Sequence, residues 1–135
     1  MDRVFLDANV LFSAAYRPDS GLRALWACED AVLIASAYAV EEASRNLSAI
    51  RPERLPDLEN LVSRMEVVAT PPASLALQES VELKEKDRPI LLAAILAKAT
   101  HLLTGDKEDF GSLFGAKVGN VLILTPGEYL RSRSG

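Results

Sequence analysis

The residues best suited to do chemistry in this chain are four carboxylates at the boundaries of predicted strands and helices. They are Asp7, Glu42, Asp87 and Asp106. Asp7 directly follows an apolar run typical of a buried strand, and Asp106 lies just past a second such run. The carboxyl ends of parallel strands share one edge of a sheet, which is where open α/β sheets bind ligands. We therefore expect Asp7 and Asp106 to be neighbours at that edge, with Glu42 reaching it from a helix.

Carboxylates gathered in this way favour a divalent cation. Two unit charges about 4 Å apart repel by about 4 kcal/mol at an effective dielectric near 20. Three or four of them would exceed the ~5–15 kcal/mol stability of a small domain unless some protonate or a cation lies among them. The chain has no cluster of histidine and cysteine, so Mg²⁺ or Mn²⁺ is favoured over zinc. Such ions polarise a phosphate and activate water, which is the chemistry of phosphodiester hydrolysis.

Short apolar runs alternate with helix-like stretches, and this alternation predicts a parallel sheet with helices on both faces. Strands are predicted at residues 4–6, 31–35, 66–68, 101–104 and 121–124. Helices are predicted at residues 10–16, 22–29, 36–47, 51–64, 73–85, 90–99 and at the C-terminal end after residue 127. Asp19 or Ser20 is suited to cap the second of these helices, and Ser36 the third. Without a repeat, a linker or a shift in composition, we expect a single domain at residues 1–135 with a three-layer α/β/α architecture.

The composition is that of an ordinary globular protein, with 49% hydrophobic and 25% charged residues. No window approaches the ~18 consecutive apolar residues of a membrane span, and the start of the sequence leaves no room for a signal peptide. The lone Cys28 cannot form an internal disulfide, which fits the cytoplasm, the location we expect. The net charge of −4 argues mildly against a general nucleic-acid binder, but 19 acidic residues less four metal ligands leave 15, equal to the 15 basic ones.

Four stretches of the sequence resemble the motifs of PIN-domain nucleases, of the bacterial type described as the toxin half of a toxin–antitoxin pair (VapC-like). They occur in family order and span nearly the whole chain: VFLDANVLF at 4–12, SAYAVEEASRNL at 36–47, DRPILLAAILAKATHLLTGDKEDF at 87–110 and VLILTPGEYL at 121–130. One such motif alone is weak, whereas four in order with sensible spacing are specific. The rather polar segment 51–64 departs from the family pattern, in a region where such toxins vary.

The resemblance implies roles for particular residues. The metal-binding and catalytic positions of the family fall on Asp7, Glu42, Asp87 and Asp106, and supporting positions fall on Asn9, Thr104 and the less regular Asp109. It also implies a five-stranded parallel sheet ordered 3-2-1-4-5. The implied activity is Mg²⁺- or Mn²⁺-dependent endonucleolytic cleavage of single-stranded RNA, with a protein antitoxin as partner and commonly a homodimer. Structured RNA is the alternative substrate.

Several of these residues also have structural interpretations. Asp7 could be a cap or turn residue, and Asp87 is a natural helix N-cap, a role that is compatible with metal binding. Glu41 is predicted to be a solvated helix residue, and only the register of the motif raises Glu42 above it. Thr104 could satisfy a strand-end hydrogen bond, or hold the following aspartate or a metal-bound water.

Other chemically active side chains are assigned structural or peripheral roles. His101, the sole histidine, is predicted to be structural rather than a general base, and Trp26 and Cys28 to be core or interface residues. Basic residues near the predicted mouth could contact phosphates. These are Arg17, Arg45, Arg88 and Lys107.

Two other functions compete with the nuclease. A HAD-type phosphohydrolase also has an aspartate after its first strand, but it needs a second aspartate where this chain has Asn9. A PIN-like domain that has lost catalysis and only binds RNA or a protein partner is the non-enzymatic alternative. The presence of all four acidic positions counts against it.

Overall fold

A computed structural model describes residues 1–71 and 88–134 of the chain. Its centre is a six-stranded sheet in the order β3-β2-β1-β4-β6-β5. The strands are β1 (Asp2–Leu6), β2 (Ala31–Ser36), β3 (Glu66–Val68), β4 (His101–Leu103), β5 (Lys117–Val118) and β6 (Val121–Leu124). The helix predicted at residues 73–85 and the proposed ligand Asp87 lie outside the described residues.

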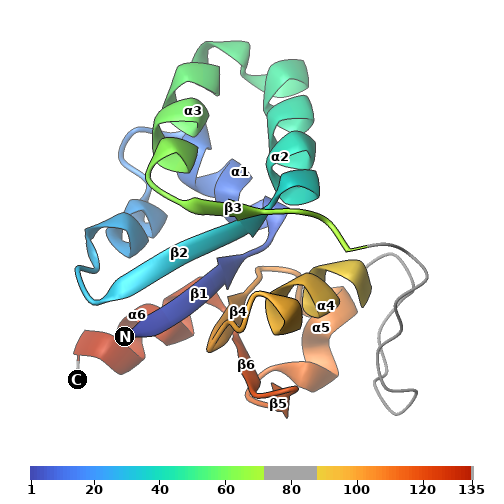
Figure 1. Ribbon diagram of the computed structural model, residues 1–135. Helices are drawn as coiled ribbons and strands as arrows, with labels where there is room; N and C mark the ends of the chain where they lie inside the picture. The colour runs from blue at the N-terminus through green and yellow to red at the C-terminus, as the bar shows by residue number, and fades with distance from the viewer. Residues whose placement is uncertain (72–87, 135) are drawn as a thin grey trace.

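Helices cover both faces of the sheet, as Figure 1 shows. The α-helices are α1 (Ala8–Tyr16), α2 (Ala37–Ile50), α3 (Leu55–Ser63), α4 (Arg88–Leu96), α5 (Lys107–Phe110) and α6 (Pro126–Ser134). Three 3₁₀ segments, η1 (Gly21–Ala27), η2 (Pro52–Arg54) and η3 (Gly111–Leu113), connect them. Helices α1, α2 and α3 lie on one face of the sheet, and α4 and α5 lie on the other. The predicted three-layer α/β/α architecture is confirmed.

Strand β1 lies at the centre because both of its faces are apolar. Val4 and Leu6 point into the core cluster beneath α1, α2 and α3, whereas Phe5 points into the cluster beneath α4. All three side chains are fully buried. Successive strand residues point to opposite faces, so an uninterrupted apolar run is what a strand covered on both sides requires.

The sheet differs from the predicted one by one strand. The five predicted strands pair in parallel in the expected order, with β6 as the fifth, but β5 adds an antiparallel edge strand beside β6. Strands β5 and β6 are joined by Gly119 and Asn120, whose φ angles are +56° and +69°. Two positive φ angles are typical of the tight turns that join hairpin strands. The prediction of an all-parallel sheet was therefore wrong at this edge, because a two-residue strand carries too little apolar pattern to be recognised.

The helix boundaries follow from their caps. Helix α1 begins at Ala8, two residues earlier than predicted, because the Asp7 side chain caps it. Ser36 caps α2 as predicted, and Ser20 rather than Asp19 caps the next segment, which is 3₁₀ and not α-helical. The predicted helix at 51–64 is divided into η2 and α3. Helix α4 ends at Leu96, before the predicted residue 99.

No helix in the described parts of the chain combines the length and the apolar character needed to cross a membrane.

Candidate active site

Asp7 lies directly after β1, at the carboxyl edge of the sheet, and is only 5% exposed. Its Oδ1 accepts a hydrogen bond of 2.7 Å from the backbone N–H of Ala8, in the first turn of α1. Its Oδ2 accepts from the Thr104 hydroxyl at 2.9 Å and from the Asn9 side-chain amide at 3.2 Å. All three donors are neutral, so the carboxylate is held in place without being neutralised.

Thr104 and Asn9 form a polar bridge between the ends of β1 and β4. The pairing of Leu6 with Leu103 places Thr104 beside Asp7, and the fully buried Thr104 hydroxyl also accepts from the Asn9 amide at 3.2 Å. The Asn9 carbonyl in turn accepts from the backbone N–H of Gly105 at 2.9 Å. These bonds fix the orientation of the Asp7 carboxylate, as expected for Asn9, and Thr104 contributes to it as well.

Asp106 follows this bridge and caps the short helix α5. Its Oδ1 accepts from the backbone N–H of Asp109 at 2.9 Å, while its own N–H donates to the Thr104 hydroxyl at 3.1 Å. The Thr104 hydroxyl is therefore hydrogen-bonded to both the backbone of Asp106 and the side chain of Asp7. This brings the two aspartates to neighbouring positions at one edge of the sheet.

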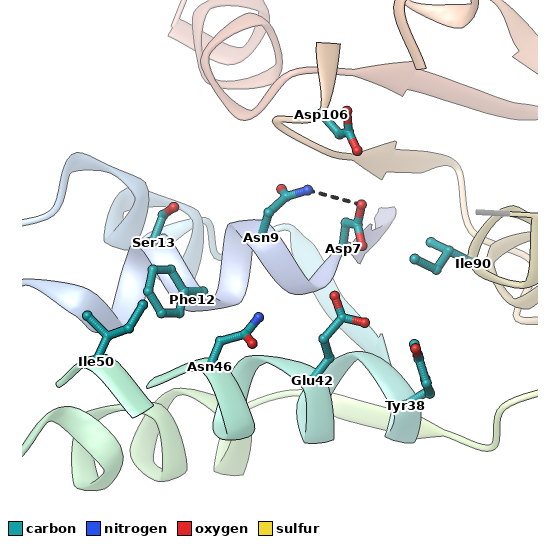
Figure 2. A pocket seen from close by; sticks show the side chains of 10 residues that line it. All are labelled: Asp7, Asn9, Phe12, Ser13, Tyr38, Glu42, Asn46, Ile50, Ile90 and Asp106. Carbon is teal, nitrogen blue, oxygen red and sulfur yellow. Dashed lines mark hydrogen bonds between the residues drawn. The ribbon is translucent and has the colours of Figure 1, made fainter. Parts of the chain in front are cut away.

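Glu42 reaches the same place from α2. Figure 2 shows its carboxylate directed towards Asp7 across a pocket of about 390 Å³, with Asp106 on the opposite side. The three carboxylates come from the ends of β1 and β4 and from α2. The remaining lining residues are Asn9, Phe12, Ser13, Tyr38, Asn46, Ile50 and Ile90.

The electrostatics of the pocket are unfavourable for Asp7. Burial raises the pKa of its carboxyl group above the ordinary 3.8, and the charges of Glu42 and Asp106 raise it further. The hydrogen bonds from Thr104 and Ala8 act against this increase, but burial is the largest cause. The charged form of Asp7 is therefore disfavoured relative to a solvated aspartate.

Among the described residues, no basic side chain forms an ion pair that would compensate for this concentration of negative charge. In the parts of the chain that the structure describes, none of Asp7, Glu42 and Asp106 forms an ion pair with lysine, arginine or histidine. Within the same residues, no three His, Cys, Asp or Glu side chains lie close enough together to enclose a metal ion by themselves. The pocket is thus open and acidic, and it is not a closed protein cage.

A family model for the PIN domain matches residues 3–108, which include every described residue of this acidic site and most of the sheet. The chain belongs to the PIN domain family. Among curated proteins, no match is found.

Solved structures with the same PIN fold come from toxin–antitoxin systems. A VapBC2 structure from Rickettsia felis, bound to a promoter DNA fragment, is 18% identical with a TM-score of 0.66 and covers 91% of this chain and 98% of its own. A toxin–antitoxin complex from Klebsiella pneumoniae is 20% identical, with a TM-score of 0.64 and coverages of 91% and 97%. VapC20 of Mycobacterium tuberculosis, described as a toxin that cleaves the sarcin–ricin loop, is 13% identical, with a TM-score of 0.58 and coverages of 81% and 93%. At these identities the likeness shows a shared fold.

The structure brings three of the four predicted PIN ligands to one pocket: Asp7, Glu42 and Asp106. Asp87 lies outside the described residues, whereas Ile90, three residues later in the sequence, lines the pocket. The predicted supporting residue Asp109 meets the site through its backbone N–H and does not line the pocket.

The competing structural interpretations are resolved residue by residue. Asp7 is indeed an N-cap, in addition to its place in the pocket. Glu41 points away and pairs with Arg45 at 3.3 Å on the exposed side of α2, as predicted for a solvated residue. Thr104 holds the Asp7 side chain and the Asp106 backbone.

The basic residues predicted at the mouth do not line the pocket. Arg17 pairs with the exposed Asp19, and Arg45 with Glu41, so both are engaged elsewhere. Lys107 is exposed in α5, and Arg88, at the start of α4, also makes interactions within the protein. Their contact with phosphates at the mouth stays a prediction.

Of the remaining assignments, the structural role of His101 and the core position of Trp26 are confirmed, whereas Cys28 belongs to neither core cluster. The His101 ring packs edge-on against Tyr129, with ring centroids 4.9 Å apart. The Trp26 indole N–H donates to the Leu61 carbonyl at 3.0 Å and the ring packs against the core. Cys28 is partly buried and is a free thiol.

Sequence reasoning missed the side of the pocket that contains no carboxylate. Tyr38, Asn46 and Ile50 join Glu42 in one stripe along α2, at intervals of four residues. Residues four apart lie on the same helix face, so this spacing from Glu42 is the signal that could have identified them.

Proposed function

We propose that the chain is a Mg²⁺- or Mn²⁺-dependent endoribonuclease that hydrolyses phosphodiester bonds of single-stranded RNA. The observation that carries this proposal is the convergence of Asp7, Glu42 and Asp106 on one pocket without a basic partner among the described residues. A site that accumulates uncompensated negative charge at a conformationally fixed position favours a cation as its ligand.

The donor set fits a hard divalent ion. The pocket offers carboxylate oxygens, and Asp7 Oδ1, which accepts a single hydrogen bond, has a lone pair left for a ligand. Mg²⁺ commonly keeps several waters and binds through one or two carboxylates, so an open arrangement suits it better than a tight cage. Asp7, Glu42 and Asp106 would hold the ion, with Asp87 added on the basis of its place in the family motif. When bound, such an ion polarises the phosphate and lowers the pKa of a coordinated water.

The protein's own residues would orient this site. Thr104 and Asn9 hold the Asp7 carboxylate in one rotamer, and Asp106 is tied to the same hydroxyl through its backbone. The second aspartate that a HAD-type phosphatase requires is replaced by Asn9, whose amide donates to Asp7 and cannot act as a general acid. This arrangement favours water as the nucleophile over an aspartyl intermediate.

We also propose that the chain is the toxin of a type II toxin–antitoxin pair, in which a protein antitoxin binds a homodimer in the cytoplasm. The support is the PIN fold shared with the Rickettsia felis and Klebsiella pneumoniae complexes described above. The chain spans almost the full length of those proteins, which is consistent with a single PIN domain at residues 1–135.

The experiment is cleavage of defined RNAs, one unstructured and one hairpin, by the purified protein with Mg²⁺, Mn²⁺ or EDTA. The unstructured RNA should be cut internally with either metal and remain intact in EDTA. Asp106→Asn should abolish the cutting, while the matched exposed substitution Glu41→Gln on α2 should leave it unchanged. Equal cleavage in EDTA, or by Asp106→Asn, would contradict the proposal.

A further inference from the structure

The pocket extends well beyond the carboxylates, along the cleft between α1 and α2. The stripe on α2 changes character along its length, from the acidic Glu42 to the amide of Asn46 and then to the aliphatic Ile50. Opposite this stripe, α1 presents Phe12 and Ser13 (Figure 2). The cleft therefore has an acidic end and an amphipathic end.

The amphipathic end has features that folding does not explain. Ile50 is 61% exposed although it is a large aliphatic residue in the last turn of a helix. Asn46 is exposed, and among the described residues its amide makes no hydrogen bond within the protein. Figure 2 shows both side chains on the side of α2 that faces α1, where they line the pocket. An unpaired amide beside an apolar surface is typical of a ligand site, where a few polar groups select among ligands.

The aromatic wall of this end is held rigidly. The ring of Phe12 lies 5.4 Å from that of Tyr16, and the Arg51 guanidinium lies over the Tyr16 ring at 4.9 Å. Arg51 also donates to the Tyr16 carbonyl at 3.2 Å, which secures the end of α2 to the end of α1. The ring of Phe12 is thus a partly exposed flat surface held by its neighbours. The positive charge of Arg51 lies behind it, against the Tyr16 ring.

We propose that this amphipathic end, formed by Phe12, Asn46 and Ile50, is a nucleobase subsite for the RNA that the carboxylates cut. The inference rests on the proposed function, and it identifies the part of the site that would give the nuclease its sequence preference. Proteins that read single-stranded RNA stack unpaired bases on aromatic or apolar side chains and hydrogen-bond to their edges. An asparagine amide offers one donor and one acceptor, which is the pair that adenine matches in bidentate recognition.

The position of Asn46 suits a base next to the scissile phosphate. It lies four residues after Glu42, one turn along the same helix face, which corresponds to about 6 Å of helix rise. A phosphate held at the carboxylates would therefore place an adjacent nucleotide beside the Asn46 amide. A base fits this end better than a second phosphate, because the described residues that line it are neutral or apolar and include no basic side chain.

The test is the distribution of cleavage sites in a pool of random single-stranded RNA, incubated with the full chain and Mn²⁺ and read by sequencing the new ends. The wild type should favour one base at a position adjacent to the cut. Asn46→Ala should reduce that preference roughly tenfold while the pool is still cleaved. Asn46→Asp, which replaces the donor with an acceptor, cannot donate to adenine N7 and should move the preference from adenine towards cytosine, whose N4 amino group donates to a carboxylate. Asn60→Ala, an exposed asparagine on α3, is the matched control and should change nothing.

A second measurement separates this inference from the proposed function. Fluorescence polarisation of labelled five-nucleotide RNAs in EDTA reports binding without cleavage. Base-dependent affinity that is lost in Asn46→Ala and weakened in Ile50→Ala would support the subsite even if the wild type cut no RNA. Cleavage with the same base preference in wild type and Asn46→Ala would overturn the subsite and leave the nuclease intact. Substitutions that weaken only the binding of a protein partner would also overturn it, because the cleft would then be a peptide groove.

Discussion

The two ends of β1 each carry an aspartate, and the protein treats them in opposite ways. Asp2 begins the strand and accepts hydrogen bonds from the Tyr129 hydroxyl at 2.8 Å and the Arg133 guanidinium at 3.1 Å, both from α6. Arg133 also pairs with Asp30, at the adjacent end of β2. Asp7 follows the strand and receives only neutral donors, with two further carboxylates nearby.

This difference separates a structural carboxylate from the one that we propose to be a metal ligand. At the amino edge, a cation and a hydroxyl from α6 satisfy Asp2, so its charge stabilises the attachment of the C-terminal helix. At the carboxyl edge, the described residues supply dipoles that position Asp7 but no positive charge that neutralises it. The buried Asp7 carboxylate thus lowers the stability of the fold, whereas the paired Asp2 does not. This is expected where a site is prepared for a ligand.

The strongest test of this contrast compares the same substitution at both ends. Asp7→Asn should reduce metal-dependent RNA cleavage by more than about 100-fold, since even residues that only support a metal ligand cost ~10–100-fold. Asp2→Asn should leave cleavage unchanged but lower the free energy of unfolding by about 1 kcal/mol, because it weakens charge-assisted bonds that are partly exposed. Initial cleavage rates and urea denaturation measure the two effects. A loss of activity in Asp2→Asn at temperatures where it is folded would break the contrast.

The second-largest expected effect is the stabilisation of the folded protein by the bound ion. A ligand that binds only the folded state at 100 times its Kd adds about 2.7 kcal/mol to the free energy of unfolding. Saturating Mn²⁺ should therefore raise the melting temperature of the wild type by several degrees, and should do so equally for Asp2→Asn. Asp7→Asn should show little or no increase. A similar increase in all three proteins would place the binding of the ion elsewhere.

How far the sequence predicted these regions depended on the range of the interactions. The run from Val4 to Leu6 and the capping serine Ser36 are local signals, and both were correctly interpreted. The pairing of β1 with β4, expected from the family resemblance, is also confirmed, and it brings Asp7 and Asp106 together. Local patterns therefore predicted most of the strands and helices, whereas the family resemblance supplied the strand order and distinguished Glu42 from Glu41.

Interactions that depend on the register between distant segments were not predictable in the same way. The attachment of α6 to Asp2 joins residues that are 131 positions apart, and no pattern in either segment predicts this contact. The sequence indicated the aspartate after Thr104 as a partner of its hydroxyl, and the structure shows that bond. It did not predict the contact with Asp7, because this contact depends on which residues of β1 and β4 lie opposite each other. The amide of Asn46 was missed because its only signal is its spacing from Glu42.

The Thr104 hydroxyl provides a smaller test of how Asp7 is positioned. Thr104→Val keeps the shape of this buried side chain but removes the bonds to Asp7 Oδ2 and to the Asp106 backbone. Cleavage should fall about tenfold, with weaker Mn²⁺ binding, as for other residues that orient metal ligands. Thr104→Ser, which retains the hydroxyl, should recover most of the loss. If Thr104→Ser is as impaired as Thr104→Val, packing of the methyl group rather than orientation of the carboxylate is responsible.

The smallest expected effect is at the amino edge, where the only histidine of the chain reports on Asp2. Burial lowers the pKa of His101 below the ordinary 6.5, and the negative charge of Asp2 partly opposes this decrease. Because the unfolded chain binds a proton more readily than the folded one, the contribution of His101 to stability is lost as the pH falls from 6.5 through the lowered pKa. An NMR titration of the single imidazole signal should give a pKa below 6.5 in the wild type and a lower one in Asp2→Asn, since the favourable charge is gone. In Asp7→Asn the His101 pKa should be unchanged, because Asp7 lies at the other end of β1 and does not contribute to it. An equal change in both variants would show that the two ends of the strand are electrostatically coupled, and the separation between a structural and a functional carboxylate would no longer hold.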